Sequence, residues 1–282
     1  MKTTLLIGAF TGLHLANLDA PIMAAPLASS TFTEIIRDVN ILPGTGDTTV
    51  PAHVNDVLQA PARVRTGPQS RAELTAPDQT ITRVGANTVF SFEGGNRSLN
   101  LEQGSLLFHA PKGIGGGIIK SGGAAAAVLG TTIIVVATPT GGFKVLFLEG
   151  HGLVTLPGGE SMKLKAGELV FVLPGQAGFS PRYYFNLEKL VASSQLLNGF
   201  PDLLSSLPLI KKAVAQQQDA LAFGNLSDTG QPLYHFNGIP GSPGSLTDPT
   251  LAHTSVTTQN PQPTTDPNRE KPPQQPYPPV FP

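Results

Sequence analysis

The chain has no cysteine and no tryptophan, and only 13% of its 282 residues are charged. The absence of cysteine excludes a disulfide scaffold, thiolate chemistry and a zinc site of the cysteine type. Lysines and arginines almost balance the acids, so the net charge is −1. A chain without a basic excess has no overall attraction to nucleic acid or to anionic lipid. We therefore expect no nucleic-acid partner.

Short motifs for catalysis and for cofactor binding are also missing. The sequence has no G-x-S-x-G nucleophile elbow, and its six histidines are too widely spaced for a local metal pair. Glycine-rich residues 113–121 fail as a phosphate loop, because Ile119 stands where such a loop needs glycine directly before Lys-Ser. A flexible hairpin loop is the better interpretation of this stretch. We expect no enzyme activity, no cofactor and no metal.

The N-terminal residues resemble a secretory signal peptide. Lys2 supplies a short positive region, residues 5–13 are largely apolar, and small residues follow at 24–30. The apolar stretch is too short to cross a hydrocarbon core of about 30 Å. We expect residues 1–25 to be a signal peptide, cleaved between Met23 and Thr31, and the mature protein to be periplasmic or extracellular. The alternative is an ordinary N-terminal tail.

Short apolar runs separated by turn residues dominate the middle of the chain. The turns carry dipeptides such as Gly67-Pro68 and Pro157-Gly158, and no helical pattern lies between the runs. A parallel α/β sheet would require helical crossovers. The pattern therefore predicts an all-β domain over residues 32–175, built as a sandwich, a roll or a short solenoid. The clearest strands are predicted at residues 80–84, 89–92, 106–109, 133–137, 143–148, 153–156 and 169–173.

Residues 121–143 carry no charge and invite a transmembrane interpretation. Glycine and proline interrupt this run, and residues 133–136 are β-branched, which favours a strand. A buried central strand explains the run without a bilayer. We therefore expect no integral membrane span, and we expect Ile134 and Val136 to face a packed interior.

The hydrophobic period changes after Pro181. Leucine and valine then fall on one helical face, Asn186 is placed to cap a helix, and a second helical stretch follows Pro208. The pattern predicts a short helical segment over residues 183–224. Residues 225–282 are rich in proline and poor in large apolar side chains, so we expect a disordered tail.

The decapeptide at residues 65–74, Arg-Thr-Gly-Pro-Gln-Ser-Arg-Ala-Glu-Leu, resembles the signature of the FecR-type domain, an all-β sensory and interaction module of bacterial envelopes. The resemblance extends over roughly residues 32–175 and implies a FecR-like β-sandwich, roll or short solenoid. In one departure, Leu129 stands where the family commonly has arginine. Similar segments follow the decapeptide at residues 78–88, 101–106, 127–131, 148–154 and 164–168.

The resemblance implies an exported, non-enzymatic interaction or sensory module of the bacterial envelope. Its partner would be another envelope or surface protein, or an envelope polymer. One alternative is a FecR-type transmembrane signal transducer that regulates a sigma factor, although we expect this chain to lack the anti-sigma and transmembrane segments of such regulators. The other is an envelope polysaccharide-binding or structural protein, although the chain offers only four tyrosines and no tryptophan for sugar stacking.

Three arginines in the signature hairpins are the candidate site. Arg65, Arg71 and Arg83 form a candidate partner-binding patch for an anionic polymer or a partner protein. The alternative is that they face water on the strand exteriors and pair with Glu73 or Asp78.

Overall fold

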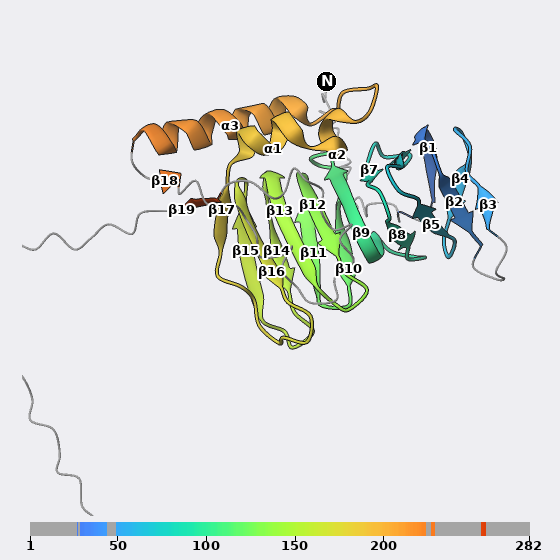
Figure 1. Ribbon diagram of the computed structural model, residues 1–282, viewed down its shortest axis with the longest axis horizontal. Helices are drawn as coiled ribbons and strands as arrows, with labels where there is room; N and C mark the ends of the chain where they lie inside the picture. The colour runs from blue at the N-terminus through green and yellow to red at the C-terminus, as the bar shows by residue number, and fades with distance from the viewer. Residues whose placement is uncertain (1–26, 28, 44–48, 224–226, 229–254, 258–282) are drawn as a thin grey trace, which may run out of the picture.

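The computed structural model describes residues 27, 29–43, 49–223, 227–228 and 255–257. The expected signal peptide and most of the expected tail lie outside these residues. In the described part, a continuous, mostly antiparallel sheet folds into two layers, and helices cover one of them (Figure 1). We call the layer under the helices the central layer and the other the outer layer.

Each layer is a row of hydrogen-bonded strands, and the long strand β9 belongs to both. Its first half pairs in the outer layer and its second half in the central layer. The central layer contains β4 (Val57–Gln59), β1 (Ser29–Ile36), β6 (Arg71–Thr75), β7 (Ile81–Val84), β9 (Ser98–Ala110), β12 (Thr131–Ala137), β13 (Phe143–Glu149), β16 (Glu168–Val172) and β17 (Tyr183–Phe185). The outer layer contains β3 (Val50–Pro51), β2 (Val39–Leu42), β5 (Arg63–Thr66), β8 (Val89–Phe92), β10 (Gly116–Ser121), β11 (Ala124–Leu129), β14 (His151–Thr155) and β15 (Ser161–Lys165).

The chain passes between the layers at sharp corners. At the corner between β13 and β14, Gly150 has a φ of 75°, and a Cβ there would lie 2.6 Å from Thr131 Oγ1. Only glycine fits such a corner without strain. Hydroxyl groups link neighbouring corners: Thr66 Oγ1 donates to the Gly85 carbonyl at 2.6 Å, and Thr131 Oγ1 donates to the His151 carbonyl at 2.9 Å. The segments that carry the FecR resemblance coincide with these corners.

The main core lies between the two layers, and a second core lies between the central layer and the helices. In β12 every residue is buried; Ile133 and Val135 belong to the first core, and Ile134 and Val136 belong to the second. The prediction that Ile134 and Val136 face a packed interior is confirmed. The prediction of an all-β domain followed by a short helical segment is confirmed as well.

Three helices follow β17: α1 (Leu187–Ser193), α2 (Gln195–Asn198) and α3 (Leu207–Ala222). As the sequence indicates, Asn186 caps α1, because its Oδ1 accepts the Lys189 amide at 2.9 Å. The boundaries differ from those predicted. The first strand, β1, begins before residue 32. Strand β17 occupies the start of the segment predicted to be helical, because it pairs with β16 and extends the central layer by one strand.

Two further stretches differ from the expectation. Residues 116–121, interpreted as part of a hairpin loop, form strand β10, where Gly117 lies under the Phe108 ring and a Cβ would come within 2.4 Å of it. Within the tail, β18 (Ser227–Asp228) and β19 (Ser255–Thr257) are paired strands, and β19 also pairs with β17. Among the described helices, none is long and apolar enough to span a membrane.

Candidate functional site: a cationic groove

Arg83 of β7 is buried under the helical layer. Its side chain is 1% exposed, and its Nε donates to Glu73 Oε2 at 2.7 Å. Its terminal nitrogens donate to backbone carbonyls of the helical segment, with Nη2 2.6 Å from the Asp202 oxygen, and the guanidinium lies 4.4 Å from the centre of the Phe200 ring. The further acceptors are the carbonyls of Leu196 and Leu197. Arg83 therefore joins the helical layer to the central layer.

The three signature arginines do not form one exposed patch. Arg71 donates from Nε to the Gly199 carbonyl at 3.2 Å and also serves the helical layer. Arg65 is exposed on β5 of the outer layer. The patch hypothesis is wrong for Arg83, and so is the alternative that Arg83 faces water; only its pairing with Glu73 holds. A buried guanidinium needs a full set of acceptors, and the carbonyls around α2 supply them.

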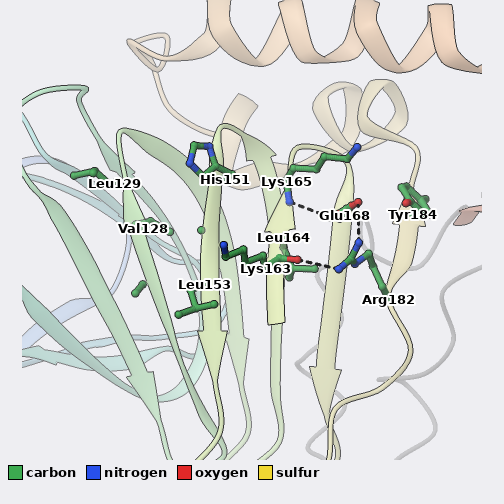
Figure 2. Close-up of a pocket in the computed structure, with 12 residues that line it drawn as sticks. Val128, Leu129, His151, Leu153, Lys163, Leu164, Lys165, Glu168, Arg182 and Tyr184 are labelled. Atoms are coloured by element: carbon green, nitrogen blue, oxygen red, sulfur yellow. Dashed lines mark hydrogen bonds and ion pairs between the residues drawn. The ribbon is translucent and has the colours of Figure 1, made fainter. Parts of the chain in front are cut away.

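A different set of cations converges at the end of the outer layer. A hollow of about 680 Å³ lies across β11, β14 and β15 and also includes Arg182 and Tyr184. Figure 2 shows the side chains that line it. Its apolar lining, which we call the floor, includes Ala127, Leu129 and Leu153, of which Leu129 is 66% exposed and Leu153 is 36% exposed. Leu129, the departure from the family pattern, thus lies at a concave surface.

The exposed charged side chains of the lining, which we call the rim, are positive. Lys163, Lys165, Arg182 and His151 are exposed there, whereas the carboxylate of Glu168 is buried. Glu168 Oε2 accepts the Lys165 amide at 3.0 Å, and its Oε1 lies 3.7 Å from Arg182 Nη1. Arg182 Nη2 also donates to the Lys163 carbonyl at 3.1 Å. Glu168 thus orients Arg182 and presents no carboxylate to a ligand.

A second hollow of about 570 Å³ continues from the first toward α3. The two share His151, Lys165 and Tyr184, and we call them together the groove. The second hollow adds two exposed lysines, Lys112 and Lys212. The whole groove is therefore lined by five lysine or arginine side chains.

The acid of the second hollow, Glu149, is recessed like Glu168. It is 4% exposed, and its Oε1 accepts a hydrogen bond from Thr132 Oγ1 at 2.9 Å. Burial raises the pKa of Glu149, although the Thr132 hydroxyl and Lys112 act in the opposite direction. A carboxyl group that is recessed and protonates more readily offsets less of the surrounding positive charge. The groove therefore favours anions.

The titratable side chains that line the groove are five lysines or arginines, His151, Tyr184 and two buried acids. Over the described residues, no group of three or more histidines, cysteines or acids is placed to hold a metal ion. Behind Glu149, His109 Nδ1 lies 2.9 Å from Thr132 Oγ1, and burial lowers the pKa of His109 to about 4. This histidine is neutral at pH 7 and belongs to a structural network that also includes Ser206 of the helical segment. The groove can hold a charged ligand by hydrogen bonds and charge.

A protein-family model described as "FecR protein" matches residues 62–151. These residues are therefore similar to a FecR domain. The match is shorter than the resemblance expected over residues 32–175, and it runs from the strand before the signature corner to the corner at Gly150. The FecR-like segment therefore includes Leu129 and His151 of the groove, while the other side of the groove lies beyond it.

The chain is also similar to two crystal structures of a "putative anti-sigma factor" from Parabacteroides distasonis ATCC 8503, at 1.65 and 2.50 Å resolution. Each shares 20% sequence identity with a TM-score of 0.39. Each match covers 43% of this chain and 59% of the other, so this chain spans less than two thirds of that relative. No curated protein matches.

Proposed function

We propose that this FecR-domain protein is an exported, non-enzymatic interaction module of the bacterial envelope, and that the groove binds its partner. The observation that carries the proposal is the asymmetry of charge in the groove: five lysine or arginine side chains line it, while both of its carboxylates are buried. Complementary charge across an interface speeds association and selects partners. The partner is therefore an envelope or surface component with an anionic face.

The polar groups at the corners near residues 65–74 support a binding role for the groove, because they are used inside the fold. Hydrogen bonds connect these corners. The Thr88 amide donates to Thr66 Oγ1 at 3.0 Å, and the Ser105 amide donates to Thr88 Oγ1 at 3.0 Å. These polar groups are satisfied inside the fold and have little left to offer a ligand. Recognition then falls to the groove, whose lysines are exposed.

Export is the second part of the proposal, and it is supported by the signal-like N-terminus. Leu27 is 1% exposed, and its amide donates to the Asn96 carbonyl at 3.0 Å. A cleavage that keeps Leu27 preserves this contact, so we expect the mature protein to begin between Ala24 and Leu27. N-terminal sequencing of the protein from fractionated cells checks this. An intact Met1 on a cytoplasmic protein would contradict export.

Affinity capture from the solubilised envelope tests the role of the groove. The variant Lys163→Glu/Lys165→Glu reverses two rim charges, and Lys189→Glu/Lys211→Glu makes the same change at exposed helical positions outside the groove. We expect the wild type and the helical variant to retain the same component, and the rim variant to lose it. Equal retention by all three proteins would show that the groove is not the binding site.

A further inference from the structure

We infer that the groove binds an extended acidic peptide segment that also carries apolar side chains, supplied by a partner protein. The inference rests on the proposed function and names the chemistry of its ligand. Three features of the groove lead to it: its length, its apolar floor, and the way its polar groups are divided between the two hollows.

The length of the groove favours a chain over a compact anion. Hollows of about 680 Å³ and 570 Å³ meet at His151, Lys165 and Tyr184. Each is comparable to a site for a small ligand, which typically measures about 300–1,000 Å³. A single phosphate or carboxylate would occupy a fraction of one hollow and contact few of the five cations. A ligand that meets all five must be extended.

The apolar floor favours a peptide over a bare polyanion. Leu129 and Leu153 are exposed in the midst of lysine and arginine side chains, next to the short side chain of Ala127. Exposed leucines on a concave surface gain stability when a ligand covers them with apolar groups. An anionic sugar chain stacks best on aromatic side chains, and Tyr184 is the sole aromatic residue among those that line the described groove.

The second hollow supplies the complementary polar contacts. Lys112, Lys212 and Gln216 line it on the side of α3 and the loop after β9. Lysines attract carboxylates, and the amide of Gln216 has both a donor and an acceptor for a peptide backbone. Because Glu149 and Glu168 are recessed, an acidic ligand meets no exposed carboxylate of the groove. Acidic side chains therefore face the rim while apolar ones face the floor.

Fluorescence anisotropy with the full chain tests the inference. Three labelled probes of equal net charge are compared: a peptide of alternating glutamate and leucine, a peptide of alternating glutamate and glycine, and an oligomer of galacturonate. We expect the glutamate–leucine peptide to bind most tightly, and Lys163→Glu/Lys165→Glu to weaken it by about tenfold or more. The control Lys189→Glu/Lys211→Glu should bind as the wild type does.

A second variant isolates the apolar contact. Leu129 is 66% exposed, so Leu129→Ser leaves the core intact. It should weaken the glutamate–leucine peptide by roughly three- to tenfold and leave the glutamate–glycine peptide unchanged. Tighter binding of the galacturonate oligomer, equal binding of both peptides, or binding of no probe would overturn the inference. The proposed function fails separately, if the envelope component is retained when the rim charges are reversed.

Discussion

Arg83 lies in the central layer and the rim lysines lie in the outer layer, and the surroundings of these cations differ. Arg83 is 1% exposed and has a carboxylate, three backbone carbonyls and an aromatic ring around it. Lys163 and Lys165 are exposed on β15, beside a carboxylate that is turned inward. In the first arrangement, every interaction of the guanidinium is made inside the protein and joins the helical segment to the central layer. The second leaves the charge available to a ligand.

The difference follows from what covers each layer of the sheet. The face of the central layer around Arg83 is covered by the helical segment, so a charge there must be neutralised inside the protein. In the part of the chain that the structure describes, no helix covers β14 and β15 of the outer layer, and both strands carry exposed residues. The lysines of β15 remain hydrated in the free protein, and their side chains are available to contact a ligand.

The largest effect should come from placing a new charge in the central layer. Val136 is 1% exposed and packs against the helices, so Val136→Asp buries a carboxylate without a partner. We expect a loss of about 4 kcal/mol or more, a large share of a domain's stability. His151→Asp, at an exposed groove position, should cost less than about 1 kcal/mol. Urea unfolding compares the two, and similar losses at both positions would contradict the layered fold.

Removing the buried guanidinium should be the next largest effect. Arg83→Met leaves Glu73 in a covered site without its partner, and we expect a loss of about 3–5 kcal/mol. Arg65→Met, at an exposed position of the outer layer, should change stability by less than about 0.5 kcal/mol. Adding Glu73→Gln to Arg83→Met should restore part of the loss, because the uncompensated charge is then gone. No restoration would mean that Arg83 acts through packing alone.

Acid should weaken the buried network through His109. Burial lowers its pKa from 6.5 to about 4, so its contribution to stability is complete above pH 6.5 and is lost as the pH falls toward 4. The total amounts to about 3 kcal/mol. Glu149 acts in the opposite sense: its raised pKa adds stability below its usual value, and this gain is lost as the pH rises through the folded-state pKa.

The variant His109→Asn separates the two contributions. It keeps a polar group near Thr132 but cannot take up a proton, so its unfolding free energy should fall less between pH 6.5 and 4 than that of the wild type. Urea unfolding at a series of pH values provides the comparison. Parallel curves for the two proteins would show that His109 does not titrate in this range.

The smallest effect on stability should come from the groove. Lys163→Glu/Lys165→Glu alters two exposed side chains, and the free energy of unfolding should change by less than about 0.5 kcal/mol. Lys189→Glu/Lys211→Glu should behave in the same way. A clear loss in the rim variant alone would mean that these lysines hold the fold and would remove the contrast with Arg83.

Much of the fold can be predicted from the sequence, because it depends on local patterns. Alternating apolar residues mark the strands, and the two apolar parities of residues 133–136 reveal a strand covered on both faces. The corner glycines that carry the FecR resemblance mark the turns. The burial of Arg83 also had a signal: it shares its strand parity with Ile81, which packs against the helical core. Its charge nevertheless favours exposure, and the prediction of an exposed patch follows that charge.

The groove could not be predicted in the same way, because no local segment contains it. Lys112, Lys165 and Lys212 come from a loop, a strand and a helix that only the folded chain brings together. In the sequence each lysine looks like an ordinary hydrated side chain. The recessed positions of Glu149 and Glu168, which leave the groove positive, depend on tertiary packing that composition does not reveal.

The retention of the envelope partner by the rim variant is the most direct test of the account. Wild-type protein, Lys163→Glu/Lys165→Glu and Lys189→Glu/Lys211→Glu are immobilised at equal folded amounts and exposed to the same solubilised envelope. The account predicts that the partner is retained by the wild type and the helical variant and is lost from the rim variant, while all three keep the same urea midpoint. Undiminished retention by the rim variant would contradict it.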